Sequence, residues 1–174
     1  MAAAPQVVDK RLQQILDDEA FMILHSGETP EIAYHSSLYY LFEDQDGPRL
    51  QPGRIDLAPL KRAVFERYRK ILLRDMNPAY RDKSIYRGLA RSIANWHRLK
   101  NFCQREGFDT EQLRREAGRH LIDFLRNETE ELFSGKKRFS SVNCSWRELE
   151  RFAAELGVDP ASLPKGVENL CSRE

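Results

Sequence analysis

The stretch SIYRGLARSIANWHRLKNFCQREG, residues 84–107, decides the fold class. Its apolar residues recur every three or four positions, which is the period of an amphipathic α-helix: Ile85, Leu89, Ile93, Trp96, Leu99 and Cys103. Ser84 is a suitable N-terminal cap and Gly107 a suitable terminator. The spacing therefore predicts a helix over residues 84–105.

The same criteria predict helices over most of the chain. Their expected ranges are 9–25, 30–43, 56–76, 109–133 and 146–156. Asp56 and Asp109 can cap two of them, and Ser145 with Glu148 has the spacing of a capping box. Residues 30–43 are apolar nearly all round, which predicts a central position, and their aromatic run leaves a strand as the alternative.

We therefore expect an all-α fold. About five long helices form a compact bundle domain in residues 1–140, and residues 141–174 form a short helical appendage packed on or near it. Three widely spaced cysteines without a C-x-x-C pair favour a reducing compartment. Neither a signal peptide nor a membrane-spanning apolar run is visible, so we expect a cytoplasmic protein that does not interact with membranes.

Charge is unevenly distributed along the chain. Residues 9–56 carry a net charge of −6, residues 57–105 carry +10, and residues 106–174 carry −3, which together give the overall +1. The basic block coincides with two predicted helices. Such segregation points to an acidic counterpart, either elsewhere in the chain or in a partner.

One face of the helix predicted at 84–105 carries a row of arginines. At 100° per residue Arg87, Arg91, Arg98 and Arg105 fall within about 40° of one another, in a row of about 27 Å. The preceding predicted helix adds Arg67, Lys70 and Arg74. Arginine binds carboxylates and phosphates bidentately. We expect an acidic protein partner in preference to nucleic acid, and self-association into a homo-oligomer stays open.

The alternative is internal compensation. The acidic first part of the chain could lie against the arginine row within the same fold; its acids include Asp17, Asp18, Glu43, Asp44 and Asp46. In that case the row would be a structural feature and not a binding surface.

A second interpretation is a metal site. Glu31 and His35 are four residues apart, as are Glu116 and His120, so each pair shares a helix face, and Glu19 lies on an apolar stripe. Pointing inward, these side chains could hold one or two transition metals. The spacing differs from the Glu-x-x-His of di-iron bundles, and a histidine bonded to its neighbouring acid is the simpler expectation. We otherwise expect no cofactor.

No covalent-catalysis, phosphate-binding or dinucleotide motif is visible, so enzymatic activity is not expected. Cys103 fits a small core residue, whereas Cys144 lies beside a predicted helix N-terminus, which would favour its thiolate. The sequence thus predicts a non-enzymatic helical binding or adaptor protein, with a metal-binding bundle as the alternative.

Overall fold

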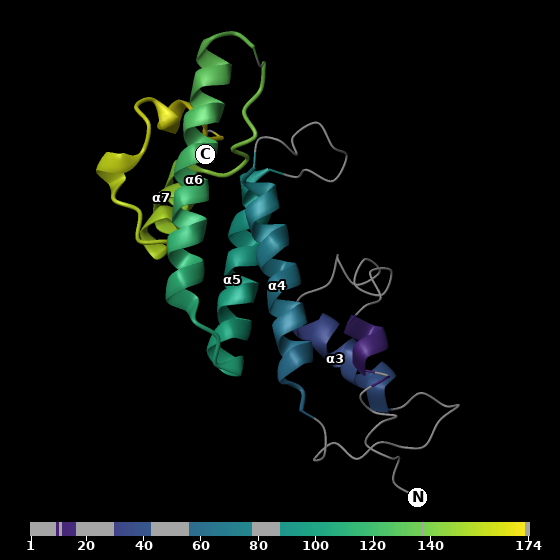
Figure 1. Ribbon diagram of the computed structural model, residues 1–174. Helices are drawn as coiled ribbons and strands as arrows, with labels where there is room; N and C mark the ends of the chain where they lie inside the picture. Colours follow the sequence, from purple (N-terminus) through teal and green to yellow (C-terminus); the bar gives the residue numbers. More distant parts are fainter. Residues whose placement is uncertain are drawn as a thin grey trace, which may run out of the picture. The chain divides into compact units, whose positions relative to one another are not determined.

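The computed structural model describes residues 10, 12–16, 30–42, 56–77, 88–136 and 138–172. Within these ranges every regular element is a helix, which confirms the all-α class. The elements are α3 (Pro30–Phe42), α4 (Ala58–Asp75), α5 (Leu89–Glu106), α6 (Thr110–Phe133), α7 (Trp146–Glu155) and the 3₁₀ turns η3 (Pro160–Ser162) and η4 (Val167–Leu170) (Figure 1). None of the helices in the described ranges is long and apolar enough to cross a membrane.

The chain divides into two compact units, residues 1–68 and 69–174. In the first unit, residues 12–16 are helical, and α3 is a helix and not the alternative strand. Its expected central position is wrong, because Ile32 is 49% and Tyr39 53% exposed. Among the side chains of α3 that the structure describes, Ala33, Tyr34, Ser37 and Leu41 are buried. Lys61 of α4 lies over the Tyr34 ring with its Nζ 5.8 Å from the centroid.

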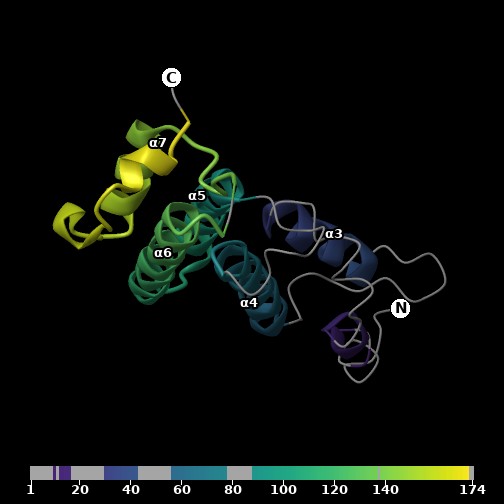
Figure 2. The same cartoon turned by 90° about the horizontal axis from the view of Figure 1, so that it is seen from above.

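The second unit is built around the α5–α6 hairpin. Gly107 ends α5 in the left-handed conformation that favours glycine, and the Asp109 side chain accepts from the backbone N–H groups of Glu111 and Gln112 to begin α6. The two helices lie side by side, with α7 next to α6 (Figures 1 and 2). Their facing sides bury the core of this unit, which includes Trp96, Leu99, Phe102, Leu121 and Phe124. Each such side chain contributes about 1.5–3 kcal/mol by burial.

The start of α5 differs from the prediction. The helix begins at Leu89 after Gly88, so the expected N-cap Ser84 is wrong and lies, like Arg87, outside the described residues. The cap comes from a distant segment: Leu89 N–H donates to the Ser141 carbonyl at 3.2 Å, and Ala90 N–H donates to Asn143 Oδ1 at 2.8 Å. A sequence-local search for a capping residue could not find this arrangement.

Residues 138–172 belong to the second unit and pack on α6. The fully buried Glu128 of α6 accepts from the Ser141 N–H at 2.8 Å, which holds the segment that caps α5. The predicted capping box of Ser145 and Glu148 begins α7. After η4, the Ser172 N–H donates to the Cys144 carbonyl at 3.1 Å, which joins the end of this segment to the residues that precede α7.

Candidate functional site

The described part of the arginine row follows one face of α5. Arg91 and Arg105 lie 14 positions apart with Arg98 midway between them, so the three extend over about 21 Å of helix. Arg98 and Arg105 are exposed, and the Arg105 Nε lies 3.3 Å from Glu106 Oε1. These three arginines share one face of α5 by helical periodicity, while Arg87 lies outside the described residues.

A buried carboxylate joins this row to α4. Asp75 is 0% exposed; its Oδ2 lies 3.4 Å from Arg91 Nε, and its Oδ1 accepts from Arg74 Nη2 at 3.3 Å. Burial raises the pKa of Asp75, and the two guanidinium groups counteract that rise in part. One carboxylate thus serves two arginines, each of which keeps about a quarter of its side chain exposed.

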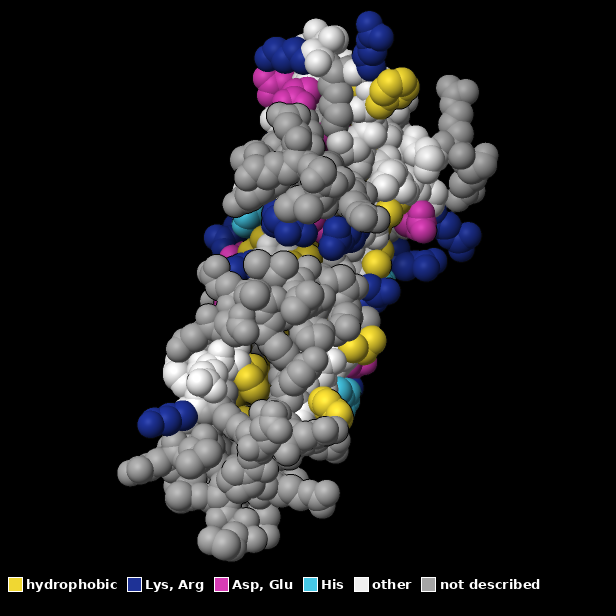
Figure 3. All heavy atoms as spheres, turned by 90° about the vertical axis from the view of Figure 1, so that its right-hand side faces the viewer, with side chains coloured by type: hydrophobic (Ala, Val, Ile, Leu, Met, Phe, Trp, Pro, Cys, Tyr) yellow, Lys and Arg dark blue, Asp and Glu magenta, His cyan; other side chains and the backbone are white. Residues whose placement is uncertain are grey.

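We use the name basic ridge for five cations of α4 and α5, two of which, Arg74 and Arg91, are joined through Asp75: Lys70, Arg74, Arg91, Arg98 and Arg105. Within the described residues, these five cations contact two carboxylates, Asp75 and Glu106, so that these seven side chains together carry a net charge of +3. Figure 3 shows Lys and Arg side chains (dark blue) gathered near the middle of the view and along its right-hand edge, with fewer acids (magenta) between them. Among these seven described side chains, the cations outnumber the acids.

Two neighbouring cations of α4 do not belong to the ridge. Arg67 is part of the first unit and is half-buried. Arg69 binds Glu116 of α6 bidentately, with Nε to Oε2 at 2.8 Å and Nη2 to Oε1 at 2.6 Å. These hydrogen bonds lower the pKa of Glu116. The acids expected to compensate the arginine row internally lie outside the described residues.

The residues of the metal interpretation are distributed over both units. Glu31 and the exposed His35 lie on α3, Glu116 and the half-buried His120 lie on α6, and Glu19 is outside the described residues. Both oxygens of Glu116 accept from Arg69 and not from His120. In the described part of the chain, no three His, Cys, Asp or Glu side chains are grouped so that they could hold a metal ion.

A polar cluster that the sequence did not reveal fixes α7 to α5. Glu155 Oε2 accepts from the buried Trp96 indole N–H at 3.0 Å and from Lys100 Nζ at 3.0 Å, and His97 Nδ1 lies 3.7 Å away. Burial raises the pKa of Glu155, but the hydrogen bonds from Lys100 and Trp96 outweigh it and the pKa is lowered overall. Because Glu155 is far from both donors in sequence, only the fold brings them together.

The cysteines are structural in character. Cys103 is fully buried on α5, as expected of a core residue. The expectation that the helix N-terminus favours the Cys144 thiolate is wrong, because Cys144 is buried and burial raises its pKa to about 12. Cys171 is half-buried, and all three thiols are free.

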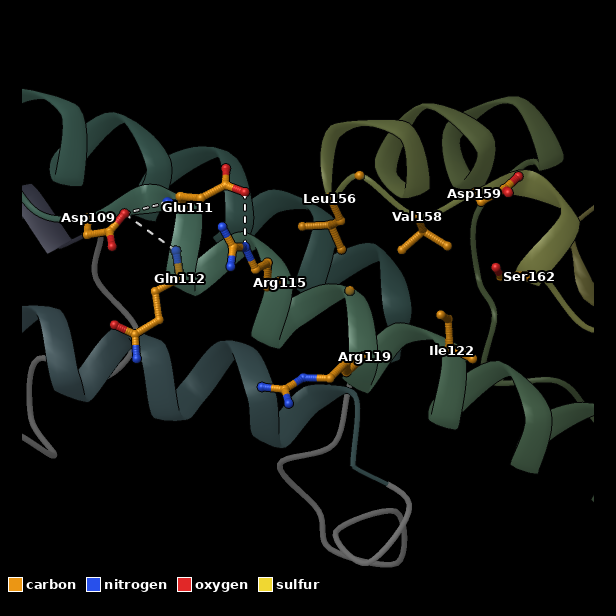
Figure 4. Close-up of a pocket in the computed structure, with 12 residues that line it drawn as sticks. Asp109, Glu111, Gln112, Arg115, Arg119, Ile122, Leu156, Val158, Asp159 and Ser162 are labelled. Atoms are coloured by element: carbon orange, nitrogen blue, oxygen red, sulfur yellow. Dashed lines mark hydrogen bonds and ion pairs between the residues drawn. The ribbon is translucent and has the colours of Figure 1, made fainter.

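A groove lies between α6 and the turn that follows α7. Its volume is about 710 Å³. Ile122 of α6 faces Leu156 and Val158 of the turn across an apolar floor, and Arg115 and Arg119 stand at the rim (Figure 4). No sequence motif marks this groove, since its two walls lie about 40 residues apart.

The described fold is that of an all-α protein. The chain belongs to a family described as a repeat of unknown function, DUF7826, whose model matches residues 11–158. No curated protein and no solved structure matches the chain significantly.

Proposed function

We propose that this chain is a non-enzymatic helical binding module that engages an acidic protein partner through the basic ridge. The observation that carries the proposal is the sharing of one buried carboxylate, Asp75, by Arg74 and Arg91. A helix surface whose charges are paired with one another usually carries both acidic and basic side chains. Here two further exposed cations, Lys70 and Arg98, add to the excess.

The dimensions of the ridge indicate what it can bind. A single exposed ion pair contributes about 0–1 kcal/mol, so useful affinity requires several pairs at once. The arginines of α5 extend over about 21 Å, which matches about four turns of a partner helix or a shorter extended segment. Association through such contacts is fast at low salt and weakens as salt screens the charges.

The test uses exposed cations, so that the fold is preserved. Lys70→Glu and Arg98→Glu are combined, because neither side chain has an ion pair to an acid within the described residues. The matched control combines Arg147→Glu and Lys165→Glu, two exposed cations outside the ridge with the same change in net charge. The probes are fluorescent poly-glutamate of about 20 residues and a DNA duplex of similar length, in about 50 and about 200 mM salt.

The proposal expects poly-glutamate to bind the wild-type chain, the ridge variant to bind it about tenfold more weakly, and the control to stay within about twofold. Equal losses in both variants would show a net-charge effect without a specific surface and would refute the ridge. Tighter, ridge-dependent binding of the duplex would overturn the assignment to an acidic protein.

A further inference from the structure

The α6 groove contains charged groups that are almost all engaged in the fold. Asp109 Oδ1 accepts from the backbone N–H groups of Glu111 and Gln112, and Asp159 Oδ1 accepts from that of Ala161. These two carboxylates are helix caps, and their function accounts for their position. They therefore do not define the ligand of the groove.

The remaining acid at the rim is paired with cations. Glu111 binds two arginines of its own helix, Arg114 at 2.8 Å and Arg115 at 3.2 Å. Hydrogen bonds from both lower the pKa of Glu111. Since Arg115 already has a carboxylate, it offers a ligand fewer free donors than an unpaired arginine would.

Arg119 differs from these groups. It is exposed, and within the described residues it makes no hydrogen bond and no ion pair. Its charge acts on Glu116, whose two oxygens already accept from Arg69. The guanidinium of Arg119 therefore keeps its planar set of donors for an external carboxylate.

The floor next to Arg119 is apolar. Ile122 follows it by three residues on the same face of α6 and is half-buried, and the buried Leu156 and Val158 form the opposite wall (Figure 4). An unpaired cation beside an apolar floor, in a cavity of about 710 Å³, has the chemistry and the size of a pocket for an amphipathic anion.

We propose that the α6 groove binds a peptide segment in which a carboxylate neighbours a large apolar side chain. The carboxylate pairs with Arg119, and the apolar side chain packs on Ile122, Leu156 and Val158. The exposed Gln112 and Ser162 at the rim supply hydrogen-bonding groups for the peptide backbone. This site is independent of the basic ridge, since none of its residues belongs to that surface.

The test is a titration of the ¹⁵N-labelled chain, monitored by amide chemical shifts, with the peptide acetyl-Leu-Glu-Leu-Glu-amide. The comparison peptide acetyl-Leu-Gln-Leu-Gln-amide keeps the shape and removes the charge. We expect the acidic peptide to shift the amides of Gly118, Gly157 and Val158. The neutral peptide should bind about 5- to 10-fold more weakly.

Two variants separate the contributions of charge and apolar surface. Arg119→Gln should remove the preference for the acidic peptide, and Ile122→Ser should weaken both peptides. The control Arg126→Gln changes an exposed arginine two turns further along α6 and should leave both affinities within about twofold. An unchanged amide spectrum in the free state verifies the fold of each variant.

Shifts confined to α4 and α5, or equal affinity for the two peptides, would overturn the groove proposal. The Lys70→Glu and Arg98→Glu variant separates this result from the ridge. If the groove binds as proposed, that variant retains the shifts around Gly157 even though it loses poly-glutamate binding.

Discussion

Replacing Gly88 with alanine tests the connection that starts α5. Gly88 has φ 76° and ψ −173°, a region that is essentially restricted to glycine, so an alanine costs about 2–3 kcal/mol. Its Cβ would also lie 2.6 Å from the Ser141 carbonyl oxygen. That segment must move, which removes the two capping hydrogen bonds to Leu89 and Ala90, at about 1 kcal/mol each. The free energy of unfolding should fall by about 4 kcal/mol.

Gly107 at the other end of the same helix is the control. It also has a positive φ, 78°, but an added Cβ would meet no atom within 4 Å. Gly107→Ala should therefore cost only the left-handed strain, about 1 kcal/mol. Urea unfolding followed by tryptophan fluorescence measures both variants. Equal losses of stability would refute the claim that the segment around Ser141 caps α5.

Three further substitutions test individual contacts. Hydrogen bonds from Arg69 lower the pKa of Glu116. This carboxylate therefore stabilises the fold above its unfolded-state pKa, and the contribution is lost as pH falls through the lower folded-state pKa. In urea unfolding between about pH 6 and pH 3, Glu116→Gln should remove about 1 kcal/mol of the pH dependence of the free energy of unfolding. Glu155→Leu leaves the buried Trp96 indole N–H without its acceptor, so the free energy of unfolding should fall by about 2 kcal/mol in chemical denaturation. The exposed control Glu150→Leu should lower it by less than about 0.5 kcal/mol. Asp75→Asn raises the net charge of the ridge by one and should tighten poly-glutamate binding about two- to threefold by fluorescence anisotropy, whereas weaker binding would contradict the ridge.

The sequence predicts the elements whose signals are local. Asp109, the capping box of Ser145 and Glu148, and the terminator Gly107 all act within a few residues, and the structure confirms each of them. The predicted cap at Ser84 fails for the opposite reason. The donors at the start of α5 are satisfied from Ser141 and Asn143, more than 50 residues away, and only the fold brings them there.

The candidate surfaces show the same limit. Helical periodicity alone aligns Arg91, Arg98 and Arg105, because position around a helix follows from residue number. Their pairing does not follow from residue number: Arg91 meets Asp75 of another helix, and Glu116 meets Arg69 instead of its neighbour His120. The α6 groove is beyond sequence reasoning altogether, since its floor combines Ile122 with residues of a turn that follows a different helix.

The central claim is that the basic ridge holds more positive charge than the fold needs. The most direct measurement follows the side-chain Nε–H resonances of the arginines by ¹H–¹⁵N spectroscopy while poly-glutamate is added. The account predicts that Arg91, Arg98 and Arg105 shift together and return as salt is raised, while the exposed Arg147 of α7 stays unchanged. Shifts spread evenly over all exposed arginines, or absent from α5, would contradict it.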